Sequence, residues 1–389
     1  MQQRILVVGS GFAGMWSALS ARRLISQSLK GSQEAVAKNI EVAVIAPDER
    51  LVPRPRLYES NPSTVDTINT AQRQVEMVDP FGTRSTVSYD RLVLAAGSRL
   101  VRPNIPGLAD HAFSVDTIDE AVKLEGHLQG LASLPDSPAR NTVIVCGAGF
   151  TGIELVAELP SRLRAILGAD AKIQVVVVGS GADVGPDLGP GPRPTILKGL
   201  NDLGVQMKLG SPVSAIDAGS VTTASGERIE ALTAIWTAGV QATPLAKQIP
   251  GDRDNFGRLR VDNDLRVTST PDVFATGDAA VAATDDQGNF TMMSCQHAQP
   301  LGRNAGHNAA ADLLHLPAIP YSQPSYGTCL DLGPDNAVVT NGWDREVMYT
   351  GQKAKEIKKY INTTLIYPPP ANAAEAFAAA DPLVEPATV

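Results

Sequence analysis

The chain has 389 residues, of which 43% are hydrophobic, and its 33 lysines and arginines against 41 acidic residues give a net charge of −8. About two to three domains with real cores fit this length, so a disordered chain is excluded, and the acidic balance argues against non-specific nucleic-acid binding. Three cysteines are too few for a disulfide-stapled secreted scaffold. The sequence also has no apolar run of ~20 residues that could cross a bilayer. It therefore predicts a cytoplasmic protein without a transmembrane segment.

The first predicted elements are a strand at 4–8 (RILVV), a glycine turn at 9–14 (GSGFAG) and a helix at 12–24. A strand that runs through such a turn into a helix is typical of a dinucleotide-binding domain. The helix N-terminus carries partial positive charge and unpaired N–H groups, which suit the pyrophosphate of a dinucleotide.

Each glycine of this turn has an expected role. Gly9 makes the tight bend, Gly11 lets the backbone approach the phosphates, and Gly14 lets the helix pack closely on the strand. Apolar strands at 41–46 and 91–96 then follow, the second ending at Gly97.

The same pattern begins again in the middle of the chain. A helix at 117–128 links the copies, and a strand at 141–146 then runs into GAGFTG at 147–152 and a helix at 153–166. Two such turns ask for two dinucleotides. FAD with NADH or NADPH is the economical pair, because a flavin takes a hydride from a reduced nicotinamide.

Strands at 172–178 and 232–236 continue the second copy. Apolar strands alternating with helices indicate an α/β protein with parallel sheets. We expect two Rossmann-like domains, for FAD and NAD(P), with the second inserted into the first, plus a small C-terminal region. The expected boundaries are 1–113 with 248–320 for the FAD-binding domain, 114–247 for the NAD(P)H-binding domain, and 321–389 for the C-terminal region with its flexible tail.

The third motif is TGD at 276–278, which follows the apolar VFA. A carboxylate at a strand end would accept strong hydrogen bonds from ribitol or ribose hydroxyls. The alternative is an ordinary turn in which Asp278 caps a helix.

The C-terminal region combines β-like alternation at 326–340 with a helix at 352–361. The helix carries Lys353, Lys355, Lys358 and Lys359, which we expect to form a solvated face. From Tyr367 onward the chain is rich in proline and alanine and is expected to be a flexible extension.

The ordered set GSGFAG, YDRLVLAAGS (89–98), GAGFTGIE (147–154), IWTAGV (235–240) and VFATGDAA (273–280) resembles the two-dinucleotide-binding-domain flavoproteins of the pyridine nucleotide–disulfide reductase superfamily. RPRLYE at 54–59 and the second turn with Glu154 are similar to type II NADH dehydrogenases, the single-chain NADH:quinone reductases. The resemblance covers about residues 1–345.

The resemblance implies site residues. Glu154 would lie near the nicotinamide, although its carboxylate could instead complement the helix dipole. FAD would contact Gly9, Gly11, Phe12, Ala13, Gly14, Val75, Ala96, Gly97, Gly277 and Asp278, with Val75 at the adenine and Asp278 at the ribitol. NAD(P)H would contact Gly147, Gly149, Phe150, Thr151, Gly152 and Gly239. No metal site is expected.

Both ribose-binding positions depart from the family. The first copy lacks the usual acid at the end of its second strand, where Asp48 or Glu49 could substitute. The second copy ends this strand in Gly179-Ser180, which would permit the 2′-phosphate of NADPH. Arg193 is the first basic residue after that strand, so the preference between NADH and NADPH stays open.

The acceptor is suggested by two observations. Cys146, Cys295 and Cys329 form no close pair in sequence, so no dithiol relay is encoded, and Cys146 reads as an inert core thiol. Type II enzymes carry an AQxAxQxG-like run, which CQHAQPLG at 295–302 matches at Gln296, Ala298 and Gly302, with Pro300 where the second glutamine is expected.

Within this run Gln296 could bind a quinone carbonyl and His297 could relay a proton, unless His297 is a surface residue. His307 and His315 are expected on the surface.

The leading hypothesis is an FAD-dependent NAD(P)H dehydrogenase in which Glu154, Gln296 and His297 serve catalysis and a quinone-like small molecule accepts the electrons. One alternative is a ferredoxin- or rubredoxin-type reductase, whose acidic carrier would dock on the lysines of 352–361. Another is a non-catalytic flavin and nicotinamide redox sensor. We expect a monomer or homodimer, no nucleic-acid partner and at most weak peripheral membrane contact.

Overall fold

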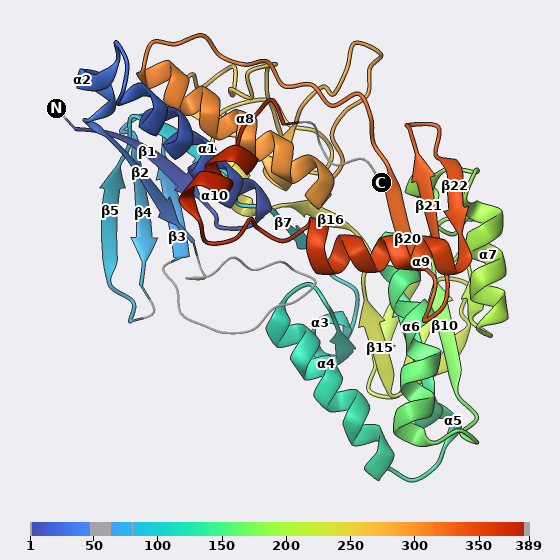
Figure 1. Cartoon of the computed structure of the whole chain (residues 1–389). Helices are drawn as coiled ribbons and strands as arrows, with labels where there is room; N and C mark the ends of the chain where they lie inside the picture. The colour runs from blue at the N-terminus through green and yellow to red at the C-terminus, as the bar shows by residue number, and fades with distance from the viewer. Residues whose placement is uncertain (1, 47–63, 80, 385–389) are drawn as a thin grey trace. The chain divides into compact units, whose positions relative to one another are not determined.

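The computed structural model describes residues 2–46, 64–79 and 81–384, and its chain forms two compact units (Figure 1). Unit 1 comprises Met1–Arg99, Val240–Pro324 and Ile366–Ala387, and unit 2 comprises Leu100–Gly239 and Ser325–Leu365 with the last two residues. The domain boundaries expected from the sequence stay a prediction.

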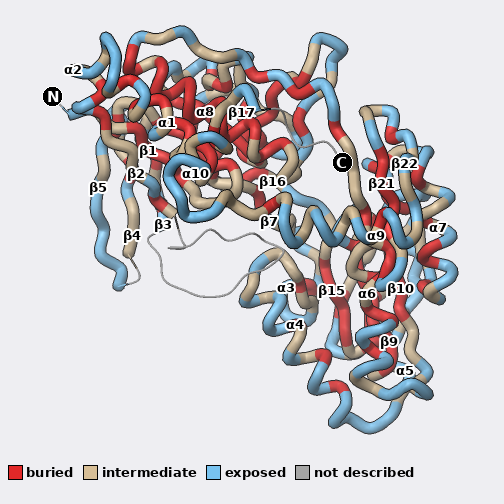
Figure 2. Tube along the Cα trace, viewed as in Figure 1, coloured by how far each residue is buried: buried red, intermediate tan, exposed pale blue. Residues whose placement is uncertain are grey.

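Unit 1 is built on a parallel sheet with strand order β18-β6-β1-β2. The central strands β1, β6 and β18 are apolar and largely buried because helices cover them, as the red core of Figure 2 shows, whereas β2 at the edge is only partly buried. Their bounds are Gln3–Val8 for β1, Ile40–Ile45 for β2, Arg91–Leu94 for β6 and Val273–Ala275 for β18.

Two helices of unit 1, α1 (Phe12–Ser28) and α8 (Cys295–Leu313), lie side by side (Figure 1). A Cβ on Gly302 would lie 2.4 Å from the carbonyl oxygen of Ala13, and one on Gly306 would lie 2.0 Å from that of Ser17. Only glycine permits this approach, so Gly302 and Gly306 hold the middle of α8 against the helix that opens at the first glycine turn.

The remaining elements of unit 1 are smaller. An antiparallel sheet contains β3 (Thr64–Asn69), β4 (Gln74–Val78) and β5 (Arg84–Ser88). The others are α2 (Glu34–Ala37), β16 (Val240–Ala242), η3 (Pro244–Gln248), β17 (Leu259–Arg260), η4 (Gly277–Ala279), β19 (Ala280–Val281) and α10 (Ala373–Ala379), and β7 (Ser98–Leu100) ends the first segment. Part of the tail expected to be a flexible extension is therefore helical.

Unit 2 has a second parallel sheet, with order β11-β10-β9-β15-β8. Its strands are β8 (Ala112–Phe113), β9 (Thr142–Cys146), β10 (Gln174–Val178), β11 (Gln206–Lys208) and β15 (Thr233–Trp236). Its longer helices are α4 (Ile118–Gly130), α6 (Phe150–Leu167) and α7 (Arg193–Asp202). The other elements before residue 240 are α3 (Leu108–His111), η1 (Leu131–Ser133), α5 (Pro138–Asn141), η2 (Pro186–Leu188), β12 (Val213–Asp217), β13 (Ser220–Thr223) and β14 (Arg228–Glu230).

The two parallel sheets repeat the same local hydrogen bonds, which confirms the α/β class with two Rossmann-like copies. Gly9 N–H donates to the carbonyl of Ile45 at 2.8 Å, and Gly147 N–H donates to that of Val178 at 2.8 Å. In each copy, therefore, the first glycine of the turn is tied to the end of the second strand.

The C-terminal part of unit 2 packs on α6. It contains an antiparallel sheet of β20 (Thr328–Asp331), β21 (Ala337–Asn341) and β22 (Glu346–Thr350), then α9 (Gly351–Tyr360) and a π-helical turn, η5 (Ile361–Leu365). The described residues contain no helix that is both long and apolar enough to span a membrane.

Candidate functional site

The first cradle, residues 9–14, is shaped by glycines that tolerate no side chain. Gly9 has φ +112°, and a Cβ there would lie 2.2 Å from the carbonyl oxygen of Ala95. A Cβ on Gly14 would lie 1.9 Å from the carbonyl oxygen of Gly9. The turn therefore closes tightly at both ends.

Between these two glycines, the position of Gly11 is open. Apart from its own neighbours in the chain, no atom of the described residues lies within 4 Å of the place where its Cβ would stand. Gly11 is also the N-cap of α1, which has no side-chain cap and no acidic residue in its first turn. An uncapped helix N-terminus beside open space fits an anion such as the pyrophosphate of FAD.

The TGD motif lies beside this cradle. Gly277 has φ +61°, and its Cβ would lie 2.7 Å from the Cβ of Ala13 and 3.8 Å from that of Ala298. Asp278 accepts a hydrogen bond of 2.6 Å from the hydroxyl of Ser98. The structure thus gathers the predicted TGD motif and the start of α8 at the first cradle, and adds Ser98, which directly follows the predicted Ala96 and Gly97.

The second cradle, residues 147–152, repeats this design. Gly147 has φ +136°, and a Cβ there would lie 2.5 Å from the hydroxyl of Thr237; one on Gly152 would lie 1.8 Å from the carbonyl oxygen of Gly147. Gly149 is again open, since the part of the chain that the structure describes places no atom within 4 Å of its Cβ position, and it caps α6 without a side chain. This geometry fits a second dinucleotide.

The other predicted contact residues differ in exposure. Phe150 and Thr151 are exposed at the start of α6, Phe12 is half-buried, and Gly239 has φ +83°. Val75 is fully buried in β4. Their cofactor contacts stay predictions, and Asp48, Glu49 and the 54–59 segment lie outside the described residues.

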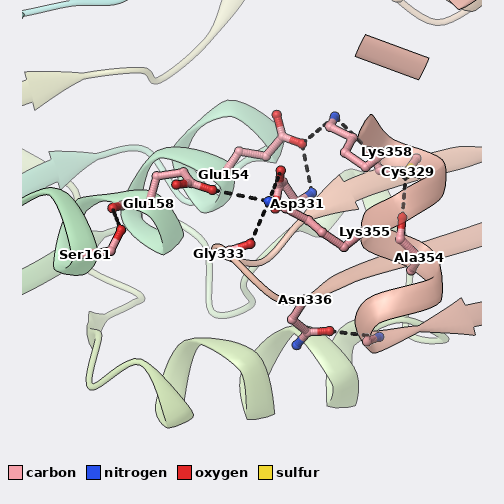
Figure 3. A network of polar contacts seen from close by, with 11 residues as sticks. Glu154, Glu158, Ser161, Cys329, Asp331, Gly333, Asn336, Ala354, Lys355 and Lys358 are labelled. Carbon is pink, nitrogen blue, oxygen red and sulfur yellow. Dashed lines mark hydrogen bonds and ion pairs between the residues drawn. The ribbon is translucent and has the colours of Figure 1, made fainter. Parts of the chain in front are cut away.

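Glu154 belongs to a polar network between α6 and the C-terminal part of unit 2 (Figure 3). Its carboxylate pairs with the ammonium group of Lys358 at 2.7 Å and accepts the backbone N–H of Asp331 at 2.9 Å. Lys358 also donates to the carbonyl of Cys329 at 3.1 Å and lies 5.5 Å from the ring centre of Phe150. Glu154 lies beyond the first turn of α6, so the helix-dipole alternative has little support.

The expectation that the four lysines of α9 form a solvated face is wrong for two of them. Lys355 contacts Asp331 at 2.6 Å, Glu158 at 3.4 Å and the carbonyl of Gly333 at 2.7 Å. The side chain of Lys358 is only 12% exposed. Burial disfavours its charge, but the carboxylate of Glu154 outweighs burial and holds the pKa of Lys358 above its ordinary value. Only Lys353 and Lys359 are exposed.

Replacing Lys358 by methionine is expected to destabilise the protein by ~2 kcal/mol, because the half-buried carboxylate of Glu154 loses its counter-ion. A raised pKa means that the ion pair contributes fully below about pH 10.5 and that this contribution is lost as the pH rises further. Thermal unfolding of both proteins should therefore show a constant difference near neutral pH that shrinks above about pH 10.5. A Lys359→Met control should match the wild type, and an equal melting temperature for the Lys358 variant would contradict the pair.

His297 is buried rather than on the surface, with 1% exposure. Its Nδ1 lies 3.2 Å from Oε1 of Gln323 and 3.3 Å from the hydroxyl of Tyr321, which itself donates to Gln323 at 2.9 Å. The Gln323 side-chain amide donates to the backbone carbonyl of Gln296 at 3.4 Å. Burial raises the pKa of Tyr321, so its hydroxyl stays protonated. Sequence reasoning missed Tyr321 and Gln323.

The surface predictions for the other two histidines have different outcomes. His315 is exposed as expected, but the surface prediction for His307 is wrong, because it is 7% exposed and burial lowers its pKa to about 4. Cys146 and Cys329 are free thiols. Burial raises the pKa of Cys146 to about 12. Burial is also the main reason that the pKa of Cys329 is raised to about 11. Neither residue is therefore a reactive thiolate near neutral pH. No cluster of metal-ligating side chains occurs within the part of the chain that the structure describes.

Known proteins resemble the chain over almost its whole length. It is 43% identical to an NADH dehydrogenase-like protein of Mycobacterium tuberculosis, over 98% of this chain and 99% of that protein. It is 25% identical to a type II NADH:quinone oxidoreductase of Staphylococcus epidermidis, over 94% and 96%. The solved structure of NDH2 from Plasmodium falciparum in complex with NADH has the same fold, with a TM-score of 0.72, 17% identity and 97% coverage of both chains.

The family model for pyridine nucleotide-disulphide oxidoreductases matches residues 3–302, which contain both cradles and the TGD motif. The match to this family model agrees with the open space at one glycine of each cradle. It confirms the expected cofactors, FAD and NADH or NADPH. The chain therefore belongs to the pyridine nucleotide-disulphide oxidoreductase family.

Proposed function

We propose that this protein is an FAD-dependent NAD(P)H dehydrogenase that delivers electrons to a quinone-like small acceptor without a redox-active disulfide. The two glycine cradles carry the proposal, since each leaves one open glycine at an uncapped helix N-terminus. The quinone acceptor is supported by the names of relatives such as the type II NADH:quinone oxidoreductase.

In this function the chain supplies binding and orientation. Residues 9–14 with Asp278 would hold FAD, and residues 147–152 would hold the coenzyme. When bound, the flavin accepts a hydride from the nicotinamide and passes the electrons to the acceptor. Glu154, held in one position by Lys358 and the N–H of Asp331, would orient the nicotinamide.

The acceptor half would use the start of α8. Gln296 is half-buried there and its side chain could bind an acceptor carbonyl, while His297 holds its Nδ1 toward the carbonyl oxygen of Gln323. That oxygen already accepts from Tyr321, so the arrangement favours a proton on Nδ1 of His297, and the imidazole would relay a proton to the acceptor.

The alternative of a reductase for an acidic carrier protein loses part of its basis. Its docking surface needed four solvated lysines, and Lys355 and Lys358 are instead committed to carboxylates of unit 2. A quinone-like small molecule is therefore the better acceptor hypothesis.

The test is stopped-flow spectroscopy of the purified protein under anaerobic conditions. The protein should be yellow, NADH or NADPH should bleach its flavin absorbance, and a soluble quinone analogue should restore the absorbance within the turnover time. Ferredoxin and rubredoxin should restore it much more slowly. Protein that takes up no FAD, or reduced flavin that no quinone reoxidises, would contradict the proposal.

A further inference from the structure

The turn between β21 and β22, residues 341–346 and here called the hairpin tip, carries a buried arginine. Arg345 is 7% exposed and adopts φ +57°, which is unusual for a residue with a side chain. Its backbone N–H donates to the carbonyl of Gly342 at 3.2 Å. The cost of this conformation and of burying a cation points to a specific role for Arg345.

Aromatic rings hold the guanidinium. Its central carbon lies 4.7 Å from the ring centre of Tyr326 and 5.8 Å from that of Trp343, and these two rings stack at 5.3 Å. Nη1 of Arg345 has no hydrogen-bond partner among the described residues. Burial lowers the pKa of Arg345, and the negative charge of Asp187 opposes this effect. The cation is thus kept by two rings and by a carboxylate from another segment.

That segment is the loop at 179–192, which joins β10 to α7. A Cβ on Gly191 would lie 2.8 Å from the carbonyl oxygen of Arg345, and one on Gly189 would lie 3.7 Å from its Cγ. The hairpin tip therefore presses on the second half of the loop, at positions where glycine makes the approach possible.

The first half of the same loop is tied to the second cradle. Gly185 N–H donates to the carbonyl of Ala148 at 2.8 Å, and Ala148 is part of residues 147–152. Arg193, at the start of α7, pairs with Asp183 at 3.3 Å across the loop. One continuous set of contacts thus runs from Arg345 through the loop to the second cradle, all of it within unit 2.

In a Rossmann fold, the residues that follow the second strand meet the adenosine ribose of the dinucleotide. Here that strand ends in Gly179-Ser180 without the usual acid, so recognition of the ribose would depend on the rest of the 179–192 loop and on the shape in which that loop is held. We propose that Arg345 is a positioning residue that holds the 179–192 loop for the adenosine half of NAD(P)H. This inference rests on the proposed function of the second cradle.

The test compares a whole coenzyme with its nicotinamide half. In Arg345→Met, kcat/KM for the preferred coenzyme (NADH or NADPH) should fall about tenfold because KM rises. Reduced nicotinamide mononucleotide lacks adenosine, so its kcat/KM should stay unchanged. Calorimetry should show the same tenfold weaker binding of ADP-ribose, or of its 2′-phosphate if NADPH is preferred, which corresponds to about 1.4 kcal/mol. Arg228→Met, at an exposed arginine of unit 2, is the matched control and should change neither.

The outcomes of this experiment separate failure of the positioning role from failure of the proposed function. Equal losses for the coenzyme and the mononucleotide, or unchanged ADP-ribose binding, would overturn the positioning role. Trp343→Leu keeps the arginine but removes one ring, and it should show a smaller change of the same kind if Arg345→Met does not fold. A wild-type protein reduced by no nicotinamide coenzyme would instead refute the proposed function, which separates the two failures.

Discussion

Gly11→Ala protein is expected to fold normally and to be purified without its flavin. The added methyl group meets no atom of residues 2–46, 64–79 and 81–384 within 4 Å beyond its own chain neighbours, and φ at this position is −67°, which alanine adopts easily. The methyl group would instead occupy the space in which the pyrophosphate must approach the N–H groups of α1. We expect FAD affinity to fall by about 100-fold, or ~2.7 kcal/mol, as measured by flavin absorbance and by titration of the apoprotein.

The control for this variant is Gly31→Ala in the same unit. Gly31 lies beyond the far end of α1, and a Cβ there would lie 3.9 Å from the carbonyl oxygen of Ser28, an ordinary contact distance. It should retain FAD fully. Gly11→Ala protein that binds FAD as tightly as the control would show that this turn does not hold the pyrophosphate.

The cradles could be predicted from the sequence because their geometry is local. Gly9 and Gly14 are five residues apart, and the clash that excludes a side chain at Gly14 comes from the carbonyl of Gly9 itself. Spacing within one turn therefore carries the whole constraint. The same holds for residues 147–152, which is why both copies were found without any knowledge of tertiary contacts.

The network around Glu154 could not be predicted in this way. Asp331 meets Glu154 from 177 residues away, and no short motif announces the pair. The lysines of α9 were interpreted as solvated because a helix with many charges usually faces water. The structure shows that Lys355 and Lys358, three residues apart and hence on one helix face, turn toward carboxylates instead.

The surface prediction for His307 is wrong for a related reason. Polar residues suggested a surface helix, but α8 is covered on almost every side, and the glycines that bring it onto α1 bury its polar side chains. His297 then finds partners in Tyr321 and Gln323, from a segment with no regular secondary structure. Such partners depend on tertiary packing, which periodicity does not encode.

Gly149→Ala is the counterpart in the second cradle, and it should separate the two half-reactions. At φ −83° the methyl group costs the fold little, and among the described residues it has no contact within 4 Å outside its own turn, so the protein should remain yellow. Reduction by NADH or NADPH should slow by about 100-fold at low coenzyme concentration, because the methyl group stands where the coenzyme phosphates approach α6. Chemical reduction by dithionite, which needs no coenzyme site, should remain as fast as in the wild type.

The matched control is Gly126→Ala, an exposed glycine inside α4 of the same unit, again with no atom within 4 Å of its Cβ position. This change should leave reduction untouched and stabilise the protein by roughly 0.5–1 kcal/mol, because alanine favours a helix interior over glycine. Comparing the two variants shows whether the open space at Gly149 binds the coenzyme or is ordinary exposed surface. If both variants are reduced at the wild-type rate, the space at Gly149 is merely empty surface; if only Gly149→Ala is slow, the space belongs to the coenzyme.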